Sequence, residues 1–235
     1  MRIAGLIVIV AACGGGSHDA TIDATPTSCS NPPAPESGDG TYYTFADGTG
    51  ACSFDATPND LNVAAMNSVD YANAAWCGAC LDVTGPQGHV VVRVVDLCPE
   101  CKHGDLDLSP QAFEQLSPLA AGRIAITWHE VPCDVSGPIA YHFKDGSNPY
   151  WTAIQIRNHR YPITKVEAKD KTGAWTSIQR LDYNFFVQAS GLGDGPYSLR
   201  VTDDRGHVVE DDSVTPGDNT TTSGASQLEA CPGGA

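Results

Sequence analysis

Basic residues are scarce in this chain of 235 residues. It has 13 Lys and Arg against 28 Asp and Glu, which gives a formal net charge of −15. The imbalance is concentrated before Pro138, where 4 basic residues stand against 16 acidic ones, while the rest of the chain has 9 against 12. Nucleic acids and anionic lipid surfaces attract basic proteins, so this composition argues against both as partners. It leaves a neutral polymer such as a polysaccharide open.

The chain also lacks a long apolar segment at its amino terminus. The run Ile3 to Val10 follows Arg2 and is shorter than the roughly 20 residues that span a bilayer, so it predicts an export signal. Val10-Ala11-Ala12-Cys13 resembles a bacterial lipobox, which predicts a signal over residues 1–13 and a lipid anchor on Cys13. An ordinary secretory signal cleaved near Ala12 is the alternative. We therefore expect an exported protein: an outer-membrane or cell-surface lipoprotein, or a secreted one.

Large apolar residues are nearly absent from two stretches that flank the folded part. Residues 14–39 are small, polar and Pro-rich, which predicts a disordered tether, and residues 215–235 read as a polar tail. Each contains one cysteine, Cys29 in the tether and Cys231 in the tail, and we expect these two to pair. The chain has nine cysteines, so lipidation of Cys13 leaves an even eight for an oxidising compartment.

Six cysteines fall between the flanking stretches, and four of them form two CxxC pairs, Cys77/Cys80 and Cys98/Cys101. This spacing is compatible with a zinc ribbon. However, Cys52 and Cys133 stand nearby, and six thiols in an exported protein are more simply three disulfides. We expect neither a metal nor a cofactor. A redox CxxC motif is expected beside a βαβ pattern, which the sequence lacks.

Helical patterns are rare, and short strand patterns dominate. Residues 40–134 combine many short strands and Gly turns with helical patterns only near 68–75 and 110–116, which favours a compact β-barrel. Residues 135–214 alternate between apolar and polar positions, with turns such as Asp145-Gly146 and Arg205-Gly206, which predicts a small antiparallel β-sandwich.

An acid ends the most apolar predicted strand. Alternation places Val90, Val92, Val94 and Asp96 on one face. If that face is the core side, Asp96 lies at the mouth of an apolar interior, where desolvation raises the pKa of a carboxyl and suits it to general acid chemistry. Asp107, in the next predicted strand, can approach the same mouth. The alternative is structural: Asp96 caps a turn and Asp107 accepts backbone hydrogen bonds.

Aromatic residues in the second predicted domain suggest a binding surface. Tyr150 and Trp151 follow Asn148-Pro149, and Tyr183 stands between polar neighbours. Exposed rings in one plane hold flat polysaccharides by stacking on sugar faces. The alternative is that Trp151 belongs to the core.

Ordered motifs over about residues 38–214 resemble the bacterial expansins, or expansin-like proteins. In the first domain they are Gly40-Thr41-Tyr42-Tyr43, Gly50-Ala51-Cys52-Ser53-Phe54, Ala65-Met66-Asn67, Cys77-Gly78-Ala79-Cys80, Val95-Asp96-Leu97-Cys98-Pro99-Glu100 and Gly104-Asp105-Leu106-Asp107-Leu108-Ser109-Pro110. In the second they are Lys144-Asp145-Gly146-Ser147-Asn148, Trp151-Thr152-Ala153-Ile154-Gln155-Ile156-Arg157-Asn158-His159, Tyr161-Pro162 and Asp182-Tyr183-Asn184.

The resemblance implies a mainly β fold: a six-stranded double-psi β-barrel related to family 45 endoglucanases, then an immunoglobulin-like antiparallel β-sandwich that binds cellulose. It implies plant cell wall loosening without measurable hydrolysis, by slipping cellulose and hemicellulose contacts. The implied site residues are Thr41, Asp96 and Asp107 in the barrel and Tyr150, Trp151, Tyr183 and Lys144 in the sandwich. Many bacterial members have a tyrosine where this chain has Cys98, and tryptophan is common where Tyr150 stands.

The same resemblance implies the disulfides Cys52–Cys77 and Cys80–Cys133, which leaves Cys98–Cys101 as the third pair. The related endoglucanases carry their base aspartate in the first strand, where this chain reads Thr41-Tyr42-Tyr43-Thr44-Phe45. Inverting hydrolysis needs an acid and a base that flank the bond. We therefore expect no significant hydrolysis.

Two other functions stay open at this point. One is glycan cleavage, either as a weak endoglucanase or as a lytic transglycosylase acting on peptidoglycan. The other is a surface-anchored adhesin that binds cellulose without loosening it. The expected polymers are cellulose and hemicelluloses such as xyloglucan or mixed β-glucan, with peptidoglycan as a further candidate. We expect a monomer that meets a membrane only through Cys13.

Overall fold

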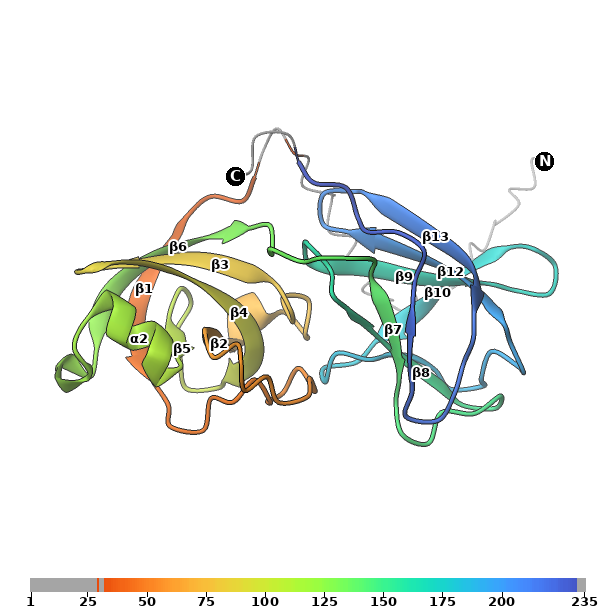
Figure 1. The fold of residues 1–235 in the computed structure, drawn as a ribbon, viewed down its shortest axis with the longest axis horizontal. Helices are drawn as coiled ribbons and strands as arrows, with labels where there is room; N and C mark the ends of the chain where they lie inside the picture. The colour runs from red at the N-terminus through yellow and green to blue at the C-terminus, as the bar shows by residue number, and fades with distance from the viewer. Residues whose placement is uncertain (1–28, 30–31, 232–235) are drawn as a thin grey trace, which may run out of the picture.

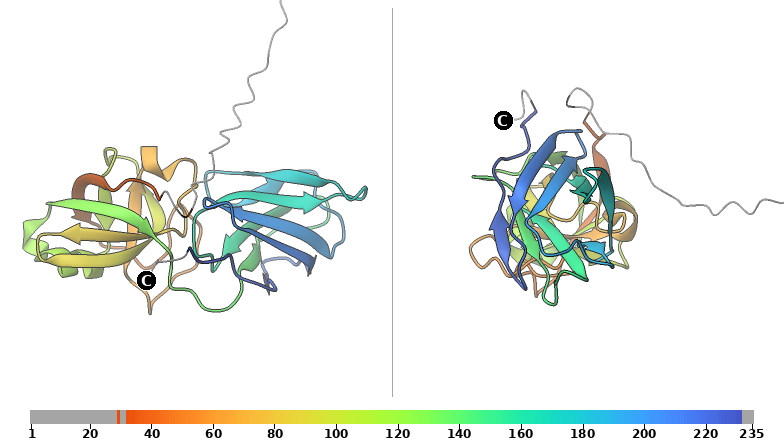
Figure 2. Two further views of the ribbon diagram at one scale, coloured as in Figure 1. Left: turned by 90° about the horizontal axis from the view of Figure 1, so that it is seen from above. Right: turned by 90° about the vertical axis from the view of Figure 1, so that its right-hand side faces the viewer.

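The computed structural model describes residue 29 and residues 32–231 (Figure 1). The predicted signal and lipidation site at Cys13 lie outside the described residues. Two β domains follow each other along the longest axis of the molecule, the first made by the amino-terminal half of the chain (Figure 2). Within the described part, no helix has the length and apolar character needed to cross a bilayer.

The first domain is a closed six-stranded barrel with the strand order β1-β5-β2-β4-β3-β6. Its strands are β1 (Glu36–Tyr42), β2 (Val63–Asn67), β3 (Cys80–Gly85), β4 (Gly88–Cys98), β5 (Leu106–Leu108) and β6 (Ile124–Val131). Its short helices are α1 (Ser68–Tyr71), α2 (Pro110–Leu116) and the 3-10 helix η1 (Leu119–Ala121). Inward-facing side chains of the strands fill the barrel, together with Phe113 and Leu116 of α2.

Local sequence explains the two α-helices. The side chain of Ser109 caps α2 by accepting from the Ala112 amide at 3.1 Å, and proline occupies the start of the helix. Asn67 caps α1 by accepting from the amides of Val69 and Asp70. The predicted helix over 68–75 is shorter in the structure, because residues 72–74 adopt positive φ.

The second domain is a β-sandwich. Its strands are β7 (Ala140–Phe143), β8 (Thr152–Arg157), β9 (Ile163–Lys169), β10 (Trp175–Arg180), β11 (Phe186–Gln188), β12 (Tyr197–Asp203), β13 (Val208–Val214) and β14 (Thr221–Ser223). The hydrogen-bonded order is β13-β12-β9-β10-β11-β8-β7-β14. Strand β10 pairs with β9 over its first residues and with β11 over its last, so it passes between the two layers. Apolar side chains of both layers form one core. The predicted fold class, barrel followed by sandwich, is confirmed.

The structure corrects both predicted domain edges. Strand β1 begins at Glu36 and pairs with β6, so the barrel starts before the predicted boundary at residue 40. The predicted polar tail contains β14, which pairs with β7, and Leu228, whose side chain is 1% exposed in the sandwich core. The segments that form β1 and β14 are short and polar, which is typical of loops. Hydrogen bonds to β6 and β7, which lie far along the chain, hold them in the sheets.

Eight cysteines form four disulfides: Cys29–Cys231, Cys52–Cys77, Cys80–Cys133 and Cys98–Cys101. These are the pairings that the sequence and the resemblance predicted. The two CxxC motifs play different parts, since Cys77 and Cys80 bond to separate distant cysteines and Cys98 bonds to Cys101. The zinc-ribbon alternative would need all four as free thiolates, and the disulfides occupy them.

Candidate functional site

Strand register brings three predicted site residues into one row. Thr41 of β1 pairs with Asp107 of β5, Asp107 pairs with Ala65 of β2, and Ala65 pairs with Asp96 of β4. Neighbouring side chains in the same row of a sheet share a face. The alternate residues of these strands, such as Leu106, belong to the barrel core. We call Thr41, Asp107 and Asp96 the carboxylate row, and it lies on the outward face of the barrel wall.

A bulge in β4 places Asp96 in this row. The register shifts between Ala64, which pairs with Val94, and Ala65, which pairs with Asp96, so Val95 is an extra residue. The prediction that Asp96 shares the face of Val90, Val92 and Val94 is therefore wrong, because strict alternation fails at the bulge. The desolvation argument that made Asp96 a general acid loses its basis.

Backbone amides hold the Asp96 carboxylate instead. Its Oδ1 accepts from the Ala51 amide at 2.7 Å and from its neighbour Leu97 at 2.8 Å. Gly50 makes this approach possible, because a Cβ there would lie 2.5 Å from Asp96 Cβ. Asp96 is half-buried and keeps its second oxygen for other partners.

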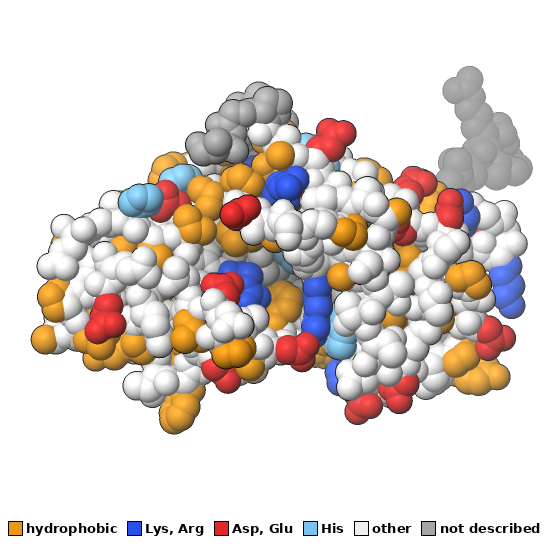
Figure 3. All heavy atoms as spheres, viewed as in Figure 1, with side chains coloured by type: hydrophobic (Ala, Val, Ile, Leu, Met, Phe, Trp, Pro, Cys, Tyr) orange, Lys and Arg blue, Asp and Glu red, His pale blue; other side chains and the backbone are white. Residues whose placement is uncertain are grey.

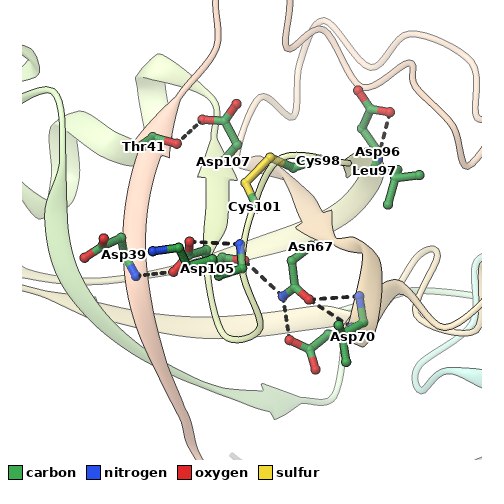
Figure 4. The surroundings of a disulfide bond; sticks show 12 residues. Asp39, Thr41, Asn67, Asp70, Asp96, Leu97, Cys98, Cys101, Asp105 and Asp107 are labelled. Atoms are coloured by element: carbon green, nitrogen blue, oxygen red, sulfur yellow. Dashed lines mark hydrogen bonds between the residues drawn. A yellow bond between two sulfur atoms is a disulfide. The ribbon is translucent and has the colours of Figure 1, made fainter.

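Asp107 is the carboxyl with the perturbed titration. Burial raises its pKa, the Thr41 hydroxyl opposes the rise by donating to its Oδ1 at 2.5 Å, and the charge of Glu100 adds to the rise. Figure 4 shows Asp107 and Asp96 on either side of the Cys98–Cys101 disulfide. Asp107 thus has the environment that the sequence had suggested for Asp96.

Tyr43 is a site residue that sequence reasoning missed. Its hydroxyl is buried without a hydrogen-bond partner in the described chain, and burial together with the charges of Asp96 and Asp107 raises its pKa. A phenolic donor therefore stands near both carboxylates. The signal was available in Gly40-Thr41-Tyr42-Tyr43, but only the fold shows that the chain turns back over the row after β1.

A polar hollow of about 520 Å³ extends the row past Asp107. It is lined by Asp39, Thr41, Cys98, Glu100, Cys101, Lys102, Asp105, Asp107 and Arg123. Asp105 shapes its wall by accepting from the amides of Asp39 at 2.8 Å and Lys102 at 3.1 Å, which fixes the loop that carries the disulfide.

The sandwich presents a second face next to the row. His142 of β7 pairs with Gln155 of β8, and the ring of Phe185, which comes just before β11, lies 6.0 Å from the His142 ring. Both Gln155 and Phe185 are buried. Phe185 supports two predicted residues: the Tyr183 ring lies 5.8 Å from it and the Lys144 Nζ 5.9 Å. Alternation along β8 places the half-buried Trp151 on the same side as Gln155. We call Trp151, Tyr183, Lys144 and Phe185 the aromatic face.

Tyr150 precedes Trp151 in the turn that leads into β8. Asn148 Oδ1 accepts from the amides of Tyr150 at 2.9 Å and Trp151 at 3.2 Å, which forms a tight turn. Tyr150 is 83% exposed at that turn. Tyr183 and Lys144 therefore meet around Phe185, while Tyr150 and Trp151 lie together at the turn before β8.

The segment after Gly50 joins the row to the aromatic face. Ala51 holds Asp96, and the next two residues accept hydrogen bonds from Gln155 Nε2 through their carbonyl oxygens, at 2.8 Å for Cys52 and 3.3 Å for Ser53. Arg157 completes the junction with an ion pair to Asp55 at 2.7 Å. Figure 3 shows basic and acidic side chains gathered where the domains meet. The segment that holds Asp96 is thus in direct contact with β8 of the sandwich.

Comparisons with known proteins agree with this architecture. Residues 61–128 match the family model described as "Lytic transglycolase". The chain is 42% identical over 166 residues to Expansin-YoaJ of Bacillus subtilis, covering 69% of this chain and 71% of that protein. It is 31% identical to Expansin-like protein 1 of Dictyostelium discoideum, covering 72% of this chain and 63% of that one.

Solved structures match both domains together. The expansin of Clavibacter michiganensis is similar with a TM-score of 0.78 and 34% identity, covering 84% of this chain and 99% of that one. A mutant of that protein, in complex with cellohexaose, matches with the same values. The high identity to a Bacillus expansin over most of both chains, together with the shared two-domain structure, shows that this chain belongs to the bacterial expansins.

Proposed function

We propose that the protein loosens plant cell walls without hydrolysis, by binding cellulose and hemicellulose and disrupting contacts between glucan chains. The observation that carries the proposal is the continuity of the carboxylate row and the aromatic face through the segment after Gly50. A related expansin was solved with cellohexaose, which is a glucan oligomer. A chain laid on the rings of the sandwich can therefore run on to the barrel row.

The two faces have different tasks in this proposal. Rings supply binding free energy by stacking on sugar faces. Asp96, Asp107 and Tyr43 offer directional hydrogen bonds that hold a glucan chain away from its neighbours. The phenol of Tyr43 provides a donor, while the Asp107 carboxyl and the free oxygen of Asp96 provide acceptors. Tyr43 thereby offers the phenolic donor that Cys98, bound to Cys101, does not.

Paper or wall extension under constant load tests this assignment. We expect Asp96→Asn to lose extension while keeping cellulose binding, since the row is not part of the stacking surface. Tyr43→Phe should reduce extension without loss of binding, because it removes the hydroxyl and keeps the ring. Binding and reducing-end release are measured on the same samples. Loss of binding in Asp96→Asn would show that the two faces are not separate in function.

Glycan cleavage is the second candidate. It is favoured by the match of residues 61–128 to a lytic transglycolase family model and by two acids that flank Ala65. Asp107, with its raised pKa, would then be the acid. Sustained release of reducing ends from soluble β-glucan, or of soluble anhydro-ended fragments from peptidoglycan, abolished by Asp107→Asn, would establish cleavage and overturn the proposal.

We also propose that the protein is exported and carries a lipid anchor on Cys13. It would then act as a monomer at the cell's own surface. A cellulose-binding adhesin shares the aromatic face but needs no carboxylate row. Extension assays separate the two, because an adhesin binds and does not extend the wall.

A further inference from the structure

An acid, a histidine and a disulfide are in contact outside the site described above. Asp203 ends β12, His207 follows in the turn before β13, and the Cys29–Cys231 bond lies against that turn. His207 Nδ1 lies 2.8 Å from Asp203 Oδ2, and His207 Nε2 lies 3.4 Å from Cys29 Sγ. The proposed wall-loosening function uses none of these groups.

The turn fixes the histidine in one orientation. Asp203 is fully buried, and its Oδ1 accepts from the amides of Arg205 at 2.9 Å and His207 at 2.8 Å. Because an ionised carboxylate can only accept, His207 Nδ1 carries a proton toward Oδ2. This leaves Nε2 directed at Cys29 Sγ, in the arrangement by which an acid orients a base next to a sulfur nucleophile or leaving group.

The disulfide is more open than most of the others. Cys29 and Cys231 are half-buried and line a hollow of about 850 Å³, whereas Cys52, Cys77, Cys80 and Cys133 are buried. Tyr161 steadies one end, since its hydroxyl accepts from the Cys231 amide at 3.0 Å. Elsewhere, Cys133 Sγ contacts the Gly78 carbonyl, which cannot donate to a leaving thiolate. Cys77 Sγ contacts the Tyr71 hydroxyl, which already donates to the Asp182 carbonyl at 3.0 Å.

We propose that Cys29–Cys231 is a thiol-exchange site, opened by a low-molecular-weight thiol with His207 as the proton carrier. The thiol gives its proton to His207 Nε2, and its sulfur attacks Cys231 Sγ. The Cys29–Cys231 bond breaks, its electron pair goes to Cys29 Sγ, and Nε2 returns the proton to that sulfur. The products are a free Cys29 thiol and a mixed disulfide on Cys231, so atoms and electrons balance.

The exchange would open the long loop of chain that the Cys29–Cys231 disulfide closes. The bond joins residues 202 positions apart, on either side of both domains. Opening it unlinks the segment before the barrel from the segment after the sandwich, while the three barrel disulfides stay intact. It also leaves Cys231 carrying the incoming group, which makes it a modification site.

The test uses the full folded protein and reduced glutathione. Samples are quenched with an alkylating maleimide over time, and peptide mass spectrometry locates each modified cysteine. We expect a glutathione adduct on Cys231 and an alkylated Cys29 to appear first, before any change at Cys98–Cys101, whose Cys101 is also half-buried. Adducts that appear first on Cys98 or Cys101, or on Cys29 as often as on Cys231, overturn the proposal.

Variants test the role of the histidine. His207→Gln should slow the exchange by roughly tenfold, because the leaving thiolate loses its stabilising partner. The exposed His89→Gln serves as control and should exchange at the wild-type rate. If His207→Gln exchanges at the same rate or faster, the histidine only packs against the bond and the assignment is wrong. The position and order of the adducts are measured on the wild-type protein. They therefore test the thiol-exchange site even if the His207→Gln variant does not fold.

Discussion

Trp151 presents an indole ring on the aromatic face, two residues from Ala153 and four from Gln155 along β8. Its removal should leave the sandwich folded, because the core is built from the opposite side of the strand. We expect Trp151→Ala to weaken cellulose binding by about 1 kcal/mol or more, roughly fivefold in Kd. Binding isotherms on crystalline cellulose measure this, with Val208→Ala, which alters an exposed apolar residue of β13, as control. Equal isotherms for Trp151→Ala and wild type would contradict the aromatic face.

Asp107 predicts a dependence of stability on pH. Burial raises its pKa, so the folded state holds the proton more tightly than the unfolded chain does. The stability that it contributes is present below the ordinary value of about 3.9 and is lost as pH rises through the raised pKa. Asp107→Asn, which stays neutral, should therefore be more stable than wild type at pH 7 and have a higher Tm. The gain in unfolding free energy should be less than about 1 kcal/mol, since solvent screens a half-exposed group.

The difference in Tm between Asp107→Asn and wild type should shrink toward about pH 3.5, below the ordinary pKa of the group. Asp96→Asn is the matched control and should lower Tm at pH 7, because its carboxylate accepts two charge-assisted hydrogen bonds from backbone amides. An Asp107→Asn Tm below wild type at neutral pH would show that the hydrogen bond from Thr41 outweighs the cost of burial.

At the scale of elements, the disulfides differ in the length of chain that they close. Cys80–Cys133 joins β3 to the end of the barrel over 53 positions, while Cys98–Cys101 closes a turn of three. Loop-closure entropy predicts a stabilisation of about 4 kcal/mol for the first and about 1.5 kcal/mol for the second. We therefore expect replacement of Cys80 and Cys133 by serine to lower the urea midpoint much more than replacement of Cys98 and Cys101. Equal losses would show that Cys98–Cys101 is needed to hold the β4–β5 loop.

The bulge in β4 has a function at the same scale. Val95 packs with Ala46 and Val63 in a small apolar cluster beneath the segment that follows β1. The cluster holds Tyr43 over the row and turns Asp96 outward beside Ala65. A run of five valines and an arginine from Val90 to Val95 contains no sign of where alternation breaks, because each valine is equally suited to either face.

At the scale of the whole molecule, a buried ion pair connects the two domains. Arg205, between β12 and β13, contacts Glu130 of β6 through Nη2 at 2.8 Å, and both side chains are almost fully buried. Asp204 lies near the same guanidinium, at 3.7 Å from Nε. Burial raises the pKa of Glu130, and the negative charge of Asp204 adds to the rise. The guanidinium is therefore what keeps two acids together at the interface.

Arg205→Met should destabilise the protein by about 3–5 kcal/mol at pH 8, because it leaves buried carboxylates without a partner. The loss should be smaller at pH 5, since a group with a raised pKa takes up a proton as pH falls and no longer needs the cation. Urea denaturation at both pH values measures the difference. Arg123→Met, which removes an exposed pair with Asp39, is the control and should cost about 0–1 kcal/mol at either pH. A pH-independent loss for Arg205→Met would mean that packing, rather than charge, holds the domains.

The sequence by itself determined the class of fold, the number of cysteines available for pairing and the strands that carry Thr41 and Asp107. These follow from local patterns: alternation, turn residues and ordered motifs act over a few positions and survive in any context that forms the strand. Only the tertiary structure decided that Asp96 faces outward, that burial raises the pKa of Asp107, and that Tyr43 lies near both carboxyls while Phe185 lies beneath Tyr183 and Lys144. The physical reason is that facing, burial and charge depend on neighbours from distant strands, and the register that brings them together is set by packing across the whole sheet.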